Sequence, residues 1–200
     1  TLWHSSAASD VYKRQRILFF IFSYFTFLLI HGQQSDTLTV GYTYWWSESG
    51  PFIGLCGEPY ALVFKGHIKS IKETPIHTNT YTSQKGSISI EEVLYSTTLA
   101  KQKYQGEKVF VSDCFYGSHL NEADAVLVFC YAYEDAYCIP GAGSILPIHR
   151  NDDAIITSVK EYITSGQNPS ILKNDKLIWE PYGLSPKITQ MIHCFELTPK

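Results

Sequence analysis

Five cysteines are the residues of this sequence best suited to chemistry. Their spacing contains no C-x-x-C pair, the arrangement typical of structural zinc sites and of redox-active dithiols. In an exported protein such cysteines favour disulfides, and an odd number leaves one thiol over. The alternative is that some are simply small buried apolar residues. We predict disulfide bonds and neither a metal site nor a cofactor, with these candidates: Cys56, Cys114, Cys130, Cys138 and Cys194.

No motif for catalysis is present. The sequence lacks G-x-S-x-G, and Cys114 with His119 is only a pair of sequence neighbours. No two histidines stand four residues apart, as metal-binding helices require. Glu91-Glu92 would point to opposite faces of a strand, and Asp152-Asp153 is explained by helix capping. We therefore predict no catalytic residues and favour a binding role over an enzymatic one.

The stretch Tyr42-Thr43-Tyr44-Trp45-Trp46 has the greatest potential for binding. Exposed Tyr and Trp offer flat apolar faces with polar edges, which suit sugar rings or a protein partner. The alternative is that alternate members belong to the core, since Trp45 and Trp46 would point to opposite faces of a strand. We take Tyr44, Trp45 and Trp46 as the predicted binding residues.

The first 32 residues indicate export. Residues 1–15 resemble translated adaptor sequence and are set aside. Ile17–Ile30 is a run of fourteen residues without charge, preceded by Lys13, Arg14 and Arg16. A lipid-spanning helix needs ~20 apolar residues, so residues 16–32 are predicted to be a signal peptide. An uncleaved anchor is the alternative, and only then would the chain contact a membrane. The predicted location is secreted or extracytoplasmic, either periplasmic or extracellular.

Composition limits the remaining chain, residues 33–200, to a single domain. The sequence is 44% hydrophobic and 14% aromatic, which suffices for one core. The whole chain has a net charge of −3, and removing the three basic residues and one acidic residue of its first 32 leaves −5. An acidic domain has no electrostatic reason to bind nucleic acid.

The hydrophobic pattern of this domain is mostly that of strands. One amphipathic helix is predicted over residues 154–163, with Asn151 or Asp152 as its cap and Gly166 after its end. Lys72–Gly86 and Asn168–Lys187 look irregular. Gly66 marks a bulge or bend within its strand. Strands are predicted at Leu38–Trp46, Ala61–Ile71, Ser87–Tyr95, Glu107–Ser112, Ala125–Tyr133, Ser144–Ile148 and Ile188–Leu197.

These elements predict a mainly β fold with one clear amphipathic helix. The loops before residue 150 show no helical period, and a parallel sheet would need helical crossovers. A small OB-like β-barrel is therefore the predicted architecture, and a β-sandwich is the alternative. The barrel core should cover about residues 52–165, followed by a C-terminal extension over 166–200.

The order of the strands resembles the netrin-like group of secreted OB-type barrels, which includes the tissue inhibitors of metalloproteinases. The resemblance covers about residues 52–165 and implies a disulfide between Cys56 and Cys138. The inhibitors chelate a protease's metal through an N-terminal cysteine, whereas Cys56 follows Leu38–Trp46, so that activity is not carried over. The residues that carry the resemblance are Phe64–Ile71, Ile88–Tyr95, Tyr104-Gln105-Gly106, Lys108–Val111 and Ala125–Phe129.

The hairpin after Ala125 allows two arrangements of its cysteines. A two-residue turn at Glu134-Asp135 would pair Tyr133 with Ala136 and put Cys130 and Cys138 on opposite faces. A three-residue loop would put the two cysteines directly opposite each other. No Gly or Asn marks the preferred turn, so the residues leave both arrangements open.

The sequence thus predicts a secreted, disulfide-containing binding domain whose ligand is an unknown protein or a carbohydrate. Two alternatives from other classes stay open. One is an exported hydrolase of unknown class with a site built from loops. The other is an envelope-associated structural protein held by an uncleaved leader.

Overall fold

The computed structural model describes residues 35–43, 46–77, 82–149 and 153–197. The chain forms two compact units, Thr1–Ser35 and Asp36–Lys200, and nearly all of the described residues belong to the second. The predicted adaptor-like residues 1–15 and the predicted signal peptide 16–32 lie outside the described residues.

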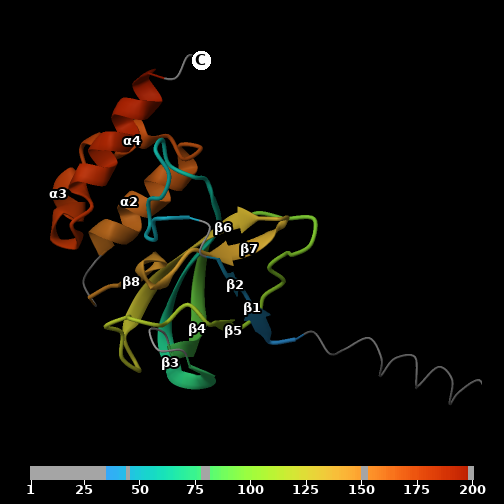
Figure 1. Ribbon diagram of the computed structural model, residues 1–200. Coiled ribbons are helices and arrows are strands. Elements are labelled where there is room, and N and C mark those ends of the chain that lie inside the picture. The colour runs from blue at the N-terminus through green and yellow to red at the C-terminus, as the bar shows by residue number, and fades with distance from the viewer. Residues whose placement is uncertain (1–34, 44–45, 78–81, 150–152, 198–200) are drawn as a thin grey trace, which may run out of the picture. The chain divides into compact units, whose positions relative to one another are not determined.

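One sheet dominates the described chain, which confirms the mainly β fold and its barrel-like form (Figure 1). Its strands follow the order β1-β5-β4-β3-β6-β7-β2, and β8 pairs with β6. The neighbours from β5 to β7 along this order are antiparallel. The central strands are β3 (Tyr60–His77), β4 (Thr82–Ser96), β5 (Val109–Ser112), β6 (Ala125–Tyr133), β7 (Ala136–Ile139) and β8 (Ile145–Pro147).

A single segment links the two ends of this sheet. Its first part, β1 (Thr37–Thr39), pairs in parallel with β5, and its second part, β2 (Gly41–Tyr42), pairs in parallel with β7. The Val40 N–H between them donates to the Val111 carbonyl at 2.9 Å. The sheet is therefore nearly closed into a barrel by a strand that passes from one edge to the other.

Alternating residues of β6 face two different cores. Val126, Val128 and Cys130 point into the barrel, whereas Leu127 and Phe129 point outward. The cluster inside the sheet is called the barrel core. It comprises Leu38, Val40, Ala61, Leu62, Phe64, Ile68, Ile88, Phe110, Cys114, Phe115, Val126, Val128, Cys130, Tyr137, Ile139 and Ile145.

Gly66 lies at the predicted bend. The pairing register of β3 with β4 shifts between Lys65 and Gly66, as a bulge requires. A Cβ on Gly66 would stand 2.0 Å from the Ser89 carbonyl oxygen, so the close approach of the two backbones excludes any side chain there. The bend predicted from Gly66 is confirmed.

Helical segments cover the outward face of β6 (Figure 1). They are α2 (Asp153–Thr164), η2 (Pro169–Lys173), α3 (Lys176–Trp179), η3 (Glu180–Tyr182) and α4 (Ser185–Leu197); the short η1 (Ala142–Ser144) lies before β8. The predicted helix over 154–163 is confirmed as α2, and its predicted cap lies outside the described residues. No helix among the described residues is both long and apolar enough to cross a membrane.

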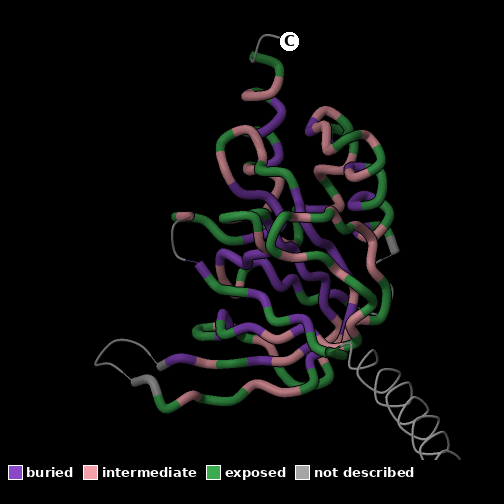
Figure 2. The backbone as a smooth tube through the Cα atoms, turned by 90° about the vertical axis from the view of Figure 1, so that its right-hand side faces the viewer, coloured by how far each residue is buried: buried purple, intermediate pink, exposed green. Residues whose placement is uncertain are grey.

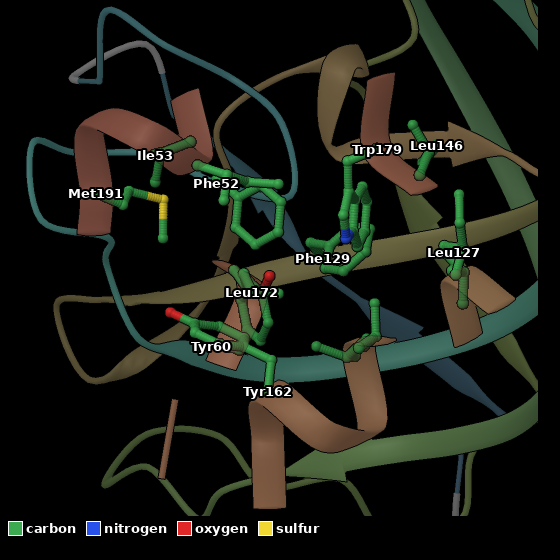
Figure 3. Packing of buried hydrophobic residues seen from close by; sticks show 14 of the residues in the cluster. Phe52, Ile53, Tyr60, Leu127, Phe129, Leu146, Tyr162, Leu172, Trp179 and Met191 are labelled. Atoms are coloured by element: carbon green, nitrogen blue, oxygen red, sulfur yellow. The ribbon is translucent and has the colours of Figure 1, made fainter. Parts of the chain in front are cut away.

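The cluster between these helices and the sheet is called the outer core (Figure 3). The indole of Trp179 is fully buried in it and donates from Nε1 to Ser158 Oγ at 2.9 Å. Its members are Phe52, Ile53, Tyr60, Val63, Leu127, Phe129, Tyr131, Leu146, Ile148, Ile155, Val159, Tyr162, Leu172, Trp179, Ile188, Met191 and Ile192.

Two predictions about the secondary structure of the C-terminal part are wrong. The segment predicted as a strand over Ile188–Leu197 belongs to α4, where Ile188, Met191 and Ile192 are buried at the three- and four-residue spacing of a helix. The irregular structure predicted for 168–187 is replaced in part by η2, α3 and η3. Residues beyond 165 are therefore part of the packed unit, and the sheet itself extends from Thr37 to Pro147.

The loop predicted over Lys72–Gly86 is also wrong, because this segment continues β3 and β4 into a hairpin arm. In Figure 2 this arm extends away from the rest of the described chain. The described pairing of β3 with β6 ends at His67, so the outer edge of β3 has no described strand partner in the arm. Pro75 is tolerated there because an edge strand needs no hydrogen-bond donor on its outer side.

The cysteines pair differently from the expectation. One disulfide joins Cys56, in the loop before β3, to Cys194 in α4, with their Cα atoms 5.0 Å apart. The pairing of Cys56 with Cys138 is therefore wrong, and three buried thiols are left over instead of one: Cys114, Cys130 and Cys138.

The β6–β7 connection has a two-residue turn. Tyr133 pairs with Ala136 and Tyr131 with Cys138, so Cys130 and Cys138 lie on opposite faces. Glu134 has φ 48° and Asp135 φ 64°, the left-handed values that a primed hairpin turn requires. The turn forms although neither position is Gly or Asn.

Candidate ligand-binding groove

The predicted aromatic site is only partly described. Tyr44 and Trp45 lie outside the described residues. Trp46 is half-buried and packs against the outer core, with its ring centroid 5.9 Å from the rings of both Tyr131 and Tyr133. Of the three predicted binding residues, the described one thus has a packing role, although its neighbour Tyr133 lines a surface groove.

This groove of about 570 Å³ lies on the outer surface of the barrel. It forms where β2, β7, the β6–β7 turn and loop 97–108 meet. The volume falls within the range of about 300–1,000 Å³ that is usual for small-ligand sites. Its lining comprises Thr39, Gly41, Tyr42, Thr43, Lys101, Gln102, Tyr133, Glu134, Ala136, Tyr137 and Cys138.

Small residues account for the depth of this groove. Gly41 is the register partner of Cys138, and Ala136 lies two residues before Cys138 on the same face of β7. A Cβ placed on Gly41 would meet no atom within 4 Å, so the space above the strand is open. Gly41 does not have a positive φ, and its extended backbone suits any residue.

Two tyrosines bring aromatic surface to the groove. Tyr42 is 39% exposed, whereas most aromatic side chains of the described residues are buried or half-buried. Tyr133 is half-buried, and its ring meets Trp46 edge to face at 71°. This contact fixes the Tyr133 ring, so the aromatic surface is held in place before any ligand arrives.

Gln102 holds loop 97–108 against the strands. Its Nε2 donates to the Thr39 carbonyl at 2.9 Å, and its Oε1 accepts from the Tyr137 N–H at 2.9 Å. The side-chain amide of Gln102 therefore bridges β1 and β7. The segment formed by β1 and β2, called the closing segment, changes there from pairing with β5 to pairing with β7. The Tyr137 hydroxyl donates to the Thr97 carbonyl and accepts from the Tyr104 N–H at 3.1 Å. The loop that forms one wall of the groove is thus anchored at several points.

The electrostatics of the groove favour a neutral ligand. Lys101 and Glu134 contribute one charge of each sign, and both residues are exposed. Burial raises the pKa of the Cys138 thiol to about 12, so this thiol is neutral at physiological pH. A neutral buried thiol is a poor nucleophile, and the groove therefore presents binding groups rather than an activated one.

The remaining chemistry-bearing residues do not converge on the groove. Burial raises the pKa of Cys114 to about 12, and the pKa of Cys130 is also well above its usual value because the thiol is buried. His67 Nδ1 lies 2.5 Å from Glu91 Oε1 on the outer surface, where both side chains are more than two-fifths exposed. Among the described residues, no group of three or more His, Cys, Asp or Glu side chains could hold a metal ion.

Most of the lining was missed from the sequence. A signal existed for Thr39 and Gly41, because they are exposed and alternate with the buried residues Leu38 and Val40 of a predicted strand. The alternation ends there, since Tyr42 is exposed and Thr43 is buried. Gln102 had no such signal, since its role depends on the two strands that it joins. A comparison with models of known protein families found no match, and a search of curated proteins found none either.

Proposed function

We propose that this protein is a binding domain that acts through the groove between β2, β7 and loop 97–108. The observation that carries the proposal is the open space above Gly41 in the groove, whose wall includes an anchored loop and an aromatic ring held by a neighbouring ring. Preformed sites favour binding because little ordering cost remains to be met when the ligand arrives.

A disulfide is typical of an oxidising, extracytoplasmic location. We propose more specifically that the domain is secreted after cleavage of a signal peptide at residues 16–32. A netrin-like relationship is a further proposal, with which a barrel-shaped sheet is compatible. An exported hydrolase remains the alternative, and it would require a base and a nucleophile near the bound ligand.

The proposal is tested by NMR of the ¹⁵N-labelled domain. Short neutral peptides and oligosaccharides are added in separate titrations, and the backbone amide shifts are mapped. We expect the shifts to centre on Gly41, Lys101 and Ala136. Gly41→Leu should remove them because its side chain enters the open space. Ala154→Leu is the matched control, since it adds a similar apolar group on the exposed side of α2. Shifts that centre elsewhere, or none with either class, would contradict the proposal.

A further inference from the structure

We propose that the groove binds a neutral carbohydrate chain, an inference that rests on the proposed binding function. The lining combines aromatic rings, hydroxyl groups and one charge of each sign. Three features of the described residues favour this ligand class: the aromatic surface, the presence of both hydrogen-bond donors and acceptors, and the pairing of the backbone groups at the edge of β7.

The aromatic surface suits a pyranose ring. One face of such a ring carries axial C–H groups, which pack against an aromatic face while the hydroxyls at the rim remain in water. Tyr42 is exposed at the groove, and the Tyr133 ring is fixed by its contact with Trp46. Tyrosine adds a hydroxyl at its edge, so each ring can pack against the sugar face and also form a hydrogen bond.

The polar groups suit a ligand that both donates and accepts hydrogen bonds. Thr39 brings an exposed hydroxyl group from β1, Lys101 brings a donor, and Glu134 brings an acceptor. Sugar hydroxyls need both kinds of partner. An anionic chain would gain from Lys101 but would meet Glu134 and the net negative charge of the protein.

The strand edges disfavour an extended peptide as the ligand. A peptide that adds to a sheet needs a strand edge with unpaired backbone groups. Here β7 already lies between β6 and β2. The Thr39 carbonyl and the Tyr137 N–H, where β1 and β7 diverge, are both bonded to Gln102. Among the described residues, the β7 edge along the groove is therefore closed to an added peptide strand.

The experiment uses three neutral probes, maltohexaose, cellohexaose and chitohexaose, with hyaluronan hexasaccharide as the anionic probe. A pool of twelve-residue neutral peptides tests the other ligand class. Binding to the disulfide-intact domain is measured by calorimetry and by ¹⁵N NMR. We expect at least one neutral hexaose to bind with its shifts centred on the groove, and Gly41→Leu to abolish that binding.

Tyr42 variants test the packing of the sugar on the ring. Tyr42→Ala should lower the affinity for the neutral hexaose about tenfold, which corresponds to about 1.4 kcal/mol of binding free energy. Tyr42→Phe keeps the aromatic face and should stay within about threefold of the parent, a loss of about 0.65 kcal/mol. Tyr116→Ala is the matched control, because Tyr116 is 45% exposed and is not part of the groove lining. This variant should bind the neutral hexaose with the affinity of the parent. Equal losses in Tyr42→Ala and Tyr116→Ala would overturn the proposal.

The outcomes separate this proposal from the one on which it rests. Peptides that bind in the groove when the neutral sugars do not would overturn the carbohydrate assignment and leave the binding function intact. Stronger binding of the anionic hexasaccharide would also overturn it. The absence of groove binding by every probe would contradict both proposals. Unchanged thermal unfolding and amide spectra of each variant show that a loss of binding does not reflect misfolding.

Discussion

The barrel core and the outer core share strand β6 but are held together by different means. Around the barrel core, backbone hydrogen bonds join strand to strand along the whole sheet. The helices of the outer core have no such ladder to the sheet, because their backbone groups bond within each helix. Their attachment depends on side chains and on the covalent bond between Cys56 and Cys194.

Polar side-chain contacts reinforce the outer core where the barrel core has backbone pairing. Tyr60 and Tyr131 donate their hydroxyls to the Pro51 and Gly50 carbonyls at 2.6 and 2.7 Å, which fix the loop before β3. Trp179 bonds to Ser158 within the helical layer. The difference implies that the helices of the outer core can unfold while the sheet stays folded. Substitutions in each core can test this order of unfolding.

One of the two largest effects is expected from removing the disulfide. Cys56→Ser with Cys194→Ser frees a loop with a sequence separation of 138 residues. The unfolded chain then gains entropy, and the free energy of unfolding should fall by about 2–5 kcal/mol. Hydrogen exchange should show that α4 loses protection before β3 and β6 do. Reductant added to the parent should reproduce the effect, and reductant added to the double variant should change nothing. Equal loss of protection in α4 and β6 would contradict the separate release of the outer core.

A comparable loss is expected from truncating one large side chain in either core. Trp179→Ala and Phe64→Ala each empty a fully buried site, and each should cost about 3–5 kcal/mol in urea unfolding. The two variants should differ in which backbone amides lose protection from hydrogen exchange. Trp179→Ala should expose the amides of α2 and α4 and spare β3. Phe64→Ala should lower protection throughout the sheet and the helices, since the helices need the sheet beneath them.

Alkaline titration should affect the barrel core first. Burial raises the pKa of Cys114 to about 12 from its ordinary value of 9.0, and that of Tyr162 in the outer core to about 12 from 10.0. A raised pKa gives stability that is complete below the ordinary pKa and is lost as the pH rises toward the folded value. Each such group should lower the free energy of unfolding by about 1.4 kcal/mol per pH unit. The decrease should begin at pH 9 for the thiol and at pH 10 for the tyrosine.

Urea unfolding between pH 8 and 10 in oxygen-free buffer measures this loss. Cys114→Ala should reduce the slope between pH 9 and 10 relative to the parent, and the part that remains comes from the buried thiols of Cys130 and Cys138, whose pKa values are also raised by burial. Tyr162→Phe should leave that slope unchanged and act only at higher pH. If Tyr162→Phe reduced the slope between pH 9 and 10 and Cys114→Ala did not, the prediction that the barrel core is affected before the outer core would be wrong.

The smallest effects are expected at exposed ion pairs, of which Lys187 of α4 with Glu48 is the stronger. Lys187 Nζ lies 2.6 Å from Glu48 Oε2, and this hydrogen bond lowers the pKa of Glu48 from 4.5. Lys187→Met should cost about 0.5–1 kcal/mol at pH 7, a modest value because Glu48 is 47% exposed. A lowered pKa stabilises above the ordinary value, so the difference should shrink as the pH falls below 4.5.

Lys160→Met provides the comparison for that ion pair. Lys160 bonds to Glu92 at 2.8 Å, and both side chains are about half exposed. Solvent screens this pair more strongly, and its loss should be smaller than that in Lys187→Met. A larger loss in Lys160→Met would mean that burial of the lysine does not determine the strength of these contacts.

The sequence predicted the barrel core better than the outer core, for a physical reason. A strand with one buried face alternates visibly, as Leu38 and Val40 do, and such a pattern is local. The segment of α4 carries only three buried side chains, and Phe195 and Leu197 extend its apolar run like a strand. Its helical form follows from packing against the sheet rather than from its own pattern.

The cysteine pairing and the groove were beyond local patterns. Cys56 and Cys194 meet because α4 packs beside the loop before β3, a contact between distant segments. The turn at Glu134-Asp135 adopts left-handed backbone angles without Gly or Asn, because β6 and β7 determine the connection between them. Gln102 likewise acquires its role from two strands that the sequence does not place together.

The closing segment has a consequence for how the chain reaches its native state. Leu38 pairs with Phe110 and Tyr42 with Ile139, so the barrel closes through contacts between residues about 70–100 positions apart. Contacts of this separation are slow to form because a long loop must be ordered first. We therefore expect the hairpin of β6 and β7 to form early and the groove, which needs Gly41 beside Cys138, to be completed late in folding. Ligand binding would then report on the last contacts made, and the rate at which binding competence returns during refolding measures the closure itself.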